Sequence, residues 1–250
     1  MSGHSKWATI KHKKGAADAK RSKLFAKLIR QVEVAARAGG GDPDMNPTLR
    51  TMYQKARDSS VPLDTIERAI KRGTGELEGV TYEQITYEGY APHGVALLVE
   101  VLTDNRNRTG AEVRTTFSRA GGSLAEPGAV AWQFDRKGSI LVDRAADEDD
   151  LMLAALDAGA EDIVDDGGAW RVTTPPSDLH AVRAALEEAG LPVESSDQVM
   201  VAANLVPLDD AGDAKSVLNL IDLLEDNDDV QAVHANLDLS DDVLVALESE

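Results

Sequence analysis

The feature that most constrains the fold is a change in apolar periodicity near residue 80. Before this point, three segments have the 3.6-residue period of amphipathic helices and are bounded by glycine or proline. After it, short strand-like runs bounded by turn residues alternate with Ala/Leu-rich helical segments. This pattern predicts an α+β protein in which an all-helical region precedes sheets that carry helices on one face.

The helical region is expected to contain three helices. The first runs from about residue 20 to 37 and ends at the glycines 39–41. The second follows Asn46 and Pro47, and the third opens at Pro62 and stops at Gly73. Proline suits the first helical turn and glycine suits the end, so each boundary has a local physical cause.

The rest of the chain predicts two α+β domains of the ferredoxin-like kind. ITYEGY and VALLVEVLTD form an expected strand pair, followed by the helix GAEVRTTFSRAGG and a second strand pair, AVAWQF and GSILVDR, across Arg136–Gly138. Two helix–glycine–strand units follow, and a last helix and the strand VQAVHANLDL end the pattern. We expect a basic arm and helical domain at 1–78, a discontinuous α+β domain at 79–129 with 207–250, and a third domain inserted at 130–206.

Charge is strongly polarised along the chain. The net charge is -18, yet residues 1–75 hold sixteen basic and seven acidic residues. The other positions hold ten basic and thirty-seven acidic residues. An acidic body repels polyanions, whereas a basic end is attracted to phosphate, so we expect the N-terminal end to approach nucleic acid.

The basic end has the composition of a phosphate-binding surface. On the first helix, Lys20, Lys23, Lys27, Arg30 and Arg37 share about a third of the circumference, opposite an apolar side on which Arg21 is the exception. Like charges at this spacing destabilise a helix unless a polyanion compensates them. The alternative is a solvated basic tail with Trp7 packed on the helical domain. The candidate nucleic-acid contacts, with Trp7 stacking on a base, are Lys6, Trp7, Lys11, His12, Lys13, Lys14, Lys20, Arg21, Lys23, Lys27 and Arg30.

A second cationic cluster lies in TDNRNRTGAEVRTTFSR. Arg106 and Arg108 are expected before a helix, and Arg114 and Arg119 on it. Arginine binds phosphate in a bidentate manner, but it also pairs with carboxylates, which are abundant here. Both interpretations stay open at this point.

Catalytic and metal-binding motifs are not found in the sequence. There is no cysteine, no GxSxG elbow and no phosphate-binding GxxxxGK[ST] loop, and the five histidines lack metal-ligand spacing. The acidic runs at 147–150 and 225–229 lack the alternation of a calcium loop. We expect a protein that is not an enzyme and uses no cofactor or metal. Because no signal peptide or long apolar run is present, a cytoplasmic location away from membranes is also expected.

Several motifs in order resemble one family. They are GHSKWATIKHKKGAADAKRSKLFAKLIRQ, GGGDPDMNPTLR, ERAIKRGTG, YEGYAPHGVALLVEVLTDNRNRT and AVAWQFDRKG, and together they resemble the YebC/PmpR family. The loop SSVPLDT departs from the Asn-Met-Pro-Lys usual there and lacks its lysine. The resemblance implies three domains, the third inserted in the second, and a cytoplasmic protein. It also implies DNA-binding transcriptional regulation; mitochondrial relatives activate translation, and bacterial members are linked to ribosomes stalled on proline runs.

Three functional hypotheses follow. The leading one is a non-catalytic, nucleic-acid-binding regulator of gene expression that docks on duplex DNA. The second is a translation factor that binds ribosomal RNA on the ribosome, and the third is an acidic scaffold for protein partners. No helix presents Arg, Asn and Gln at base-reading spacing, so sequence-specific DNA binding is not predicted. Recognition of RNA shape and phosphate needs no such helix.

Overall fold

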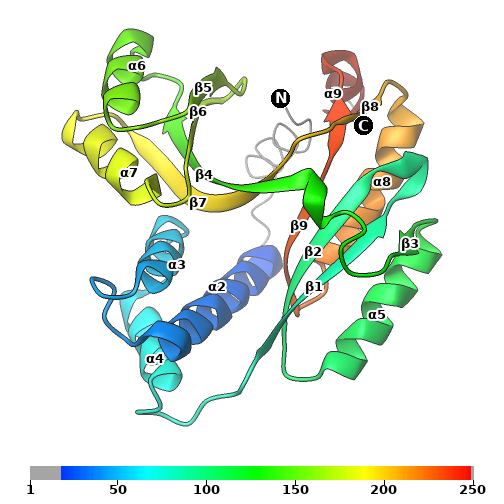
Figure 1. Cartoon of the computed structure of the whole chain (residues 1–250), viewed down its shortest axis with the longest axis horizontal. Helices are drawn as coiled ribbons and strands as arrows, with labels where there is room; N and C mark the ends of the chain where they lie inside the picture. The colour runs from blue at the N-terminus through cyan, green and yellow to red at the C-terminus, as the bar shows by residue number, and fades with distance from the viewer. Residues whose placement is uncertain (1–17, 249–250) are drawn as a thin grey trace. The chain divides into compact units, whose positions relative to one another are not determined.

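The computed structural model describes residues 18–248, and its N-terminal part is helical (Figure 1). The helices are α2 (Asp18–Gly39), α3 (Pro47–Asp58) and α4 (Leu63–Gly73). Asn46 caps α3, because its side-chain oxygen accepts a hydrogen bond from the Leu49 N–H at 3.1 Å, and Pro62 precedes α4. The three predicted helices and their start signals are therefore confirmed.

The helical region has a core of its own, in which α2 and α4 approach closely. Leu28, Val32, Leu49 and Ile66 are fully buried in it. Gly73, predicted only as a helix stop, is the last residue of α4 and touches α2. A Cβ atom at Gly73 would lie 2.4 Å from the Glu33 carbonyl oxygen, so a side chain there would force the two helices apart.

The first sheet has the strand order β3-β1-β2-β9 and is covered by α5 (Arg106–Arg119) and α8 (Ala211–Glu225). Its strands are β1 (Glu83–Tyr90), β2 (Ala96–Thr103), β3 (Ser123–Leu124) and β9 (Val230–Ala235). β1 and β2 form the predicted hairpin across the turn Pro92–Gly94. Alternate residues of β2 pack toward the helices or toward a smaller cluster with Val130 and Phe134, so this strand is buried on both faces.

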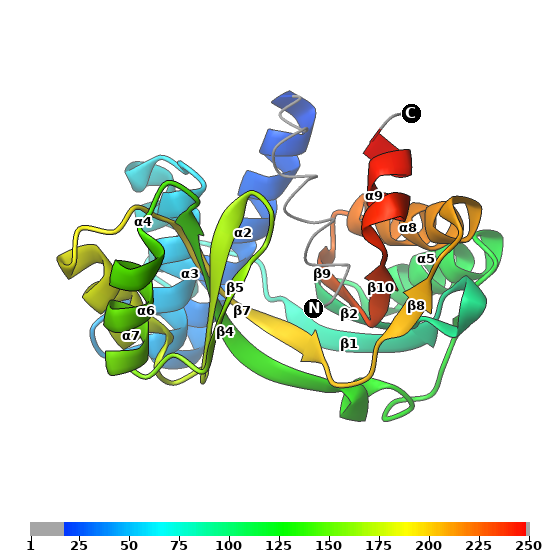
Figure 2. The same ribbon diagram turned by 90° about the horizontal axis from the view of Figure 1, so that it is seen from above.

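The second sheet has the order β5-β6-β4-β7 and carries α6 (Glu148–Asp157) and α7 (Leu179–Glu188) side by side (Figure 2). Its strands are β4 (Phe134–Asp143), β5 (Asp162–Asp165), β6 (Ala169–Thr174) and β7 (Val193–Ala202). The chain order strand–helix–strand–strand–helix–strand is that of the ferredoxin-like motif. The first sheet differs from this order, because it begins with a hairpin. Both sheets lie in the predicted α+β class, which is confirmed.

Two local predictions are wrong. Residues 134–143 form the single strand β4, and 131–133 form a short 3-10 helix, so no hairpin turns at Lys137 and Gly138. Gly138 instead pairs with Thr174 of β6, where a Cβ atom would lie 2.2 Å from the threonine hydroxyl. The last predicted strand is divided at Asn236 into β9 and β10 (Leu237–Leu239), and β10 pairs in parallel with β8 (Val206–Leu208).

The described chain separates into two compact units. One contains residues 81–135 and 200–248, including the C-terminal helix α9 (Asp241–Glu248), and the other contains 18–80 and 136–199. The expected domain boundaries near 79, 130 and 206 stay a prediction. Among the described helices, none combines the length and apolar character needed to span a bilayer.

Candidate nucleic-acid interface

Helix α2 buries one side in the helical core and places cations on and beside the other. Leu28 and Val32 are buried, and Lys23 is exposed, whereas Lys27 and Arg30 are half-buried at the border. Half-burial suits long cationic side chains, because their methylene stems cover apolar surface while their charged ends reach water. Arg21, predicted to be the exception on the apolar side, is exposed, with its guanidinium carbon 5.4 Å from the centre of the Phe25 ring.

The remaining candidates of the basic end lie partly outside the described residues. Lys20 is on the first turn of α2, but its side chain is outside the description. The candidates of the arm are wholly outside it; they are Lys6, Trp7, Lys11, His12, Lys13 and Lys14. Their expected contacts with nucleic acid stay a prediction.

Glu33 follows the cations of α2 along the helix, and its side chain is buried. The residue is 3% exposed, and one carboxylate oxygen accepts a hydrogen bond from the Arg72 Nε at 2.9 Å. Its other oxygen lies 3.5 Å from the Arg37 guanidinium. Glu33 therefore directs its charge into the helical core and not onto the exposed side of α2. Sequence reasoning missed it, although Glu33 falls beside Ile29 on the apolar side of the helix.

Two amide side chains of the helical region form internal hydrogen bonds, and the oxygen of a third is buried. The Asn46 side chain donates to the carbonyl oxygens of Ala35 and Gly40, and Gln54 donates to Asp58 at 2.9 Å. The side-chain oxygen of Gln31 is buried. These are the only amide side chains between residues 18 and 80 of the described chain, and their internal bonds and burial do not favour the reading of base edges.

Within residues 18–248, the second cationic cluster contains two arginines in ion pairs, Arg106 and Arg108, and two that form none, Arg114 and Arg119. Helix α5 already begins at Arg106, so the prediction that Arg106 and Arg108 precede the helix is wrong; Asn105 caps it by accepting from the Arg108 N–H at 3.1 Å. Arg106 pairs with Glu83 at 3.0 Å, and Arg108 pairs with Asp229 at 2.6 Å. Internal pairing therefore occupies these two arginines.

Asp229 anchors this end of α5. The carboxylate is almost buried, and it accepts hydrogen bonds from the hydroxyls of Thr109 at 2.6 Å and Thr103 at 3.1 Å in addition to Arg108. Burial alone would raise the pKa of Asp229, but the hydrogen bonds from Thr109, Arg108 and Thr103 outweigh it and lower the pKa. Arg108 is thus part of the structural support of α5.

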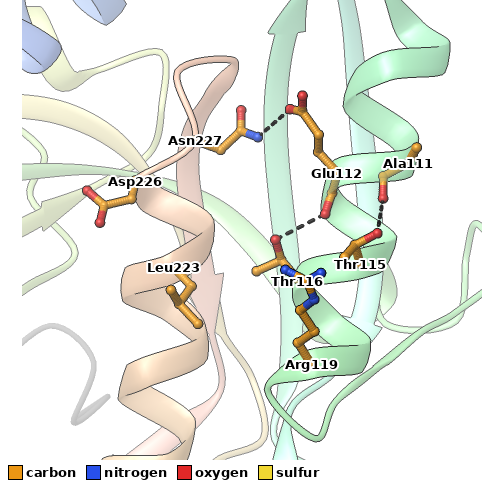
Figure 3. A pocket seen from close by; sticks show the side chains of 8 residues that line it. All are labelled: Ala111, Glu112, Thr115, Thr116, Arg119, Leu223, Asp226 and Asn227. Atoms are coloured by element: carbon orange, nitrogen blue, oxygen red, sulfur yellow. Dashed lines mark hydrogen bonds between the residues drawn. The ribbon is translucent and has the colours of Figure 1, made fainter.

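Arg114 and Arg119 are exposed on the outer side of α5. Burial raises the pKa of Tyr87, and the charges of Arg106 and Arg114 oppose that rise, so Arg114 lies within electrostatic reach of the phenol. Arg119 borders an open hollow of about 490 Å³ between α5 and α8 (Figure 3). The hollow mixes Leu223 with the carboxylates of Asp226 and Glu112, and Glu112 accepts from Asn227 at 2.9 Å. It lacks the enclosed apolar walls of a small-molecule site.

The acidic runs are used for local structure. Asp147 caps α6 by accepting from the N–H groups of Asp149 and Asp150, and Asp229 supports α5. Within residues 18–248, no three histidine or carboxylate side chains converge as a metal-binding group would.

Comparison with known proteins decides the family. A model described as the TACO1/YebC protein N-terminal domain matches residues 5–76, and one described as the TACO1/YebC second and third domain matches residues 82–237. The chain belongs to the TACO1/YebC family. The resemblance found in the sequence motifs is thereby confirmed.

Relatives in this family match the chain along its length. A probable transcriptional regulatory protein of Halothermothrix orenii is 55% identical over 100% of both chains, and one of Salinispora arenicola is 57% identical over 99% of this chain and 100% of its own. The crystal structure of a conserved hypothetical protein from Aquifex aeolicus is 44% identical. It matches with a TM-score of 0.82, covering 90% of this chain and 93% of that one.

Proposed function

We propose that this TACO1/YebC protein is a non-catalytic regulator of gene expression that binds nucleic acid through the cationic side of α2. The observation that carries the proposal is the charge of this helix: five cations and no acid lie between residues 19 and 32, and Glu33 is buried against Arg72. The relatives named probable transcriptional regulatory proteins support a regulatory role.

The contact is made mainly to phosphates. Lysine and arginine side chains that have no exposed Asn or Gln side chains beside them bind the phosphates of the nucleic-acid backbone. Such contacts carry no sequence information. Arg114 and Arg119, exposed on α5, supply a second phosphate contact, whereas Arg106 and Arg108 stay in their internal pairs. The acidic remainder of the chain repels other phosphates and limits binding to these cationic surfaces.

Ribosomal RNA is the second candidate target beside duplex DNA. The internal hydrogen bonds of Asn46 and Gln54 and the burial of the Gln31 side-chain oxygen favour recognition by shape and phosphate, which a folded RNA satisfies as well as a DNA duplex. In the DNA version the protein acts at promoters in the cytoplasm. In the RNA version it acts on the ribosome as a translation factor.

The test is a salt series of binding to duplex DNA and to purified ribosomes. The variant Lys23→Ala/Lys27→Ala removes two cations from α2. Its matched control, Lys137→Ala/Arg144→Ala, removes two cations that are paired with Glu161 and Asp165. Each neutralised phosphate contributes about 0.9 to the log–log salt slope on duplex DNA, so we expect the α2 variant to flatten the slope by about 1.8. The control has the same net charge and is expected to keep the wild-type slope.

The outcomes separate the hypotheses. A slope on DNA that only the α2 variant flattens supports the DNA version. Retention on ribosomes that only the α2 variant loses, with negligible DNA binding, supports the translation version. If neither target is bound, or if both variants change the slope equally, the proposed interface is wrong. In that case an acidic scaffold for proteins becomes the better hypothesis.

A further inference from the structure

Helix α6 exposes an apolar side that the fold does not cover. Leu151 and Ala155 are fully buried in the core beneath it, whereas Met152, Leu153 and Leu156 are 43%, 66% and 50% exposed. At about 100° per residue, these three side chains lie together on the side opposite the core. No other helix in the described part of the chain exposes more than one large apolar side chain.

The same side of α6 is surrounded by negative charge. Asp149 lies between Met152 and Leu153 around the helix, and Asp157 borders Leu153, all of them exposed. The ten residues of α6 include no lysine, arginine or histidine. Acidic residues in the first turn interact favourably with the helix dipole, whereas Asp157 in the last turn interacts unfavourably with it. Helix stability therefore does not explain the negative charge of Asp157.

The neighbouring cations are engaged elsewhere. The Lys137 ammonium lies 2.9 Å from both carboxylate oxygens of Glu161, and Arg144 pairs with Asp165 at 2.9 Å while lying 4.0 Å over the Trp170 ring. Asp149 and Asp157 have no such ion pair within residues 18–248. An uncovered apolar stripe beside uncompensated carboxylates is complementary to a segment that is apolar in the middle and cationic at its edges.

We infer that the outer side of α6 binds a protein partner through a cationic amphipathic segment of that partner. Nucleic acid does not fit, because the carboxylates repel phosphate and the stripe offers no donor. The amphipathic cationic helix of this chain, α2, already packs Leu28 and Val32 in its own core, so a second copy does not offer its apolar side. With three apolar side chains and a charged rim, the surface is small, and small interfaces are typical of transient contacts.

The probe for this surface is a fluorescein-labelled leucine/lysine peptide of about four helical turns with its leucines on one side. A peptide of the same composition, with the leucines distributed around the helix, measures binding by charge alone. Anisotropy titrations use the full-length protein and two pairs of variants. The variant Leu153→Gln/Leu156→Gln removes two leucines of the apolar stripe. Its control is Leu223→Gln/Val245→Gln, which replaces apolar side chains that are 45% and 62% exposed on α8 and α9. Asp149→Asn/Asp157→Asn removes the charge, and Glu126→Gln/Asp209→Asn, both exposed, is its control.

We expect the stripe variant to weaken binding of the amphipathic peptide at least about tenfold, because two half-exposed leucine side chains are lost from the contact. The charge variant is expected to weaken binding and to reduce its salt dependence, while both controls bind as the wild type does. Equal losses in a control and its α6 variant would overturn the inference, as would equal affinity for the two peptides. A wild-type dimer in sedimentation that Leu153→Gln/Leu156→Gln dissolves would assign the stripe to a second copy and also overturn it.

Discussion

Glu88 offers a sharp test of how the loop at 125–133 is held. This buried carboxylate accepts three backbone hydrogen bonds, from Gly128 at 2.6 Å, Val130 at 2.7 Å and Ala131 at 2.8 Å. Burial alone would raise the pKa of Glu88, but the three N–H donors outweigh burial and lower it. The carboxylate thus holds the loop that presents Trp132, which is 71% exposed.

The expected effect of Glu88→Gln follows from these bonds. The amide keeps one oxygen, which can accept from two of the three donors at neutral strength. Its NH₂ group then faces the third N–H, which stays unsatisfied at a cost of about 1–3 kcal/mol. Replacing charge-assisted bonds by neutral ones adds about 1 kcal/mol, so the loop should be destabilised by about 2–4 kcal/mol.

Amide hydrogen exchange measures this effect locally. Since about 1.4 kcal/mol corresponds to tenfold, protection of the Gly128, Val130 and Ala131 amides should fall by about 30-fold or more in Glu88→Gln. Glu126→Gln, an exposed acid of the same loop, should leave their protection unchanged. Protection within about threefold of wild type in Glu88→Gln would show that the Glu88 carboxylate does not hold this loop.

Two further predictions concern a buried aspartate and a half-buried histidine. Asp229→Asn should lower the free energy of unfolding by about 2 kcal/mol at neutral pH. Because the pKa of Asp229 is lowered in the folded protein, that difference should shrink as the pH falls below its ordinary value of 3.8, and urea titrations of both proteins at several pH values measure it. The His180 ring and the Thr51 hydroxyl share a hydrogen bond of 2.9 Å. Burial of His180, together with the positive charges of Arg50 and Arg183, lowers the pKa of His180 below 6.5. Stability should therefore be lost as the pH falls below about 6.5, and His180→Gln should reduce that loss; an unchanged pH dependence would count against this role.

Features set by neighbouring residues could be predicted from the sequence. The start of α3 at Pro47, the start of α4 directly after Pro62 and the hairpin turn at Pro92–Gly94 depend on residues within one turn. The structure has them within one residue of where the sequence placed them. The buried apolar side of α2 follows from its period and is also present. Such features depend on local sterics and burial, which are encoded in short windows.

Features set by distant partners could not be predicted in this way. Lys137 and Gly138 have the composition of a turn, but the partner of Gly138 is Thr174 on another strand, so the chain runs straight there. The inward orientation of Glu33 depends on Arg72, thirty-nine residues away. The pairing of Arg108 with Asp229 likewise joins residues far apart in the chain. This pair distinguishes Arg108, which supports the fold, from the arginines of α5 that are exposed to a ligand.

The most direct test of the central claim is a photocrosslink from α2. A diazirine-bearing lysine analogue at position 23 is irradiated in living cells, and the same analogue at the exposed position 209 serves as control. If α2 is the nucleic-acid interface, position 23 gives nuclease-sensitive crosslinks and position 209 gives none. Sequencing the attached fragments distinguishes DNA from ribosomal RNA. Crosslinks from position 23 to protein alone, or equal yields of nucleic acid from both positions, would show that α2 is not the nucleic-acid interface.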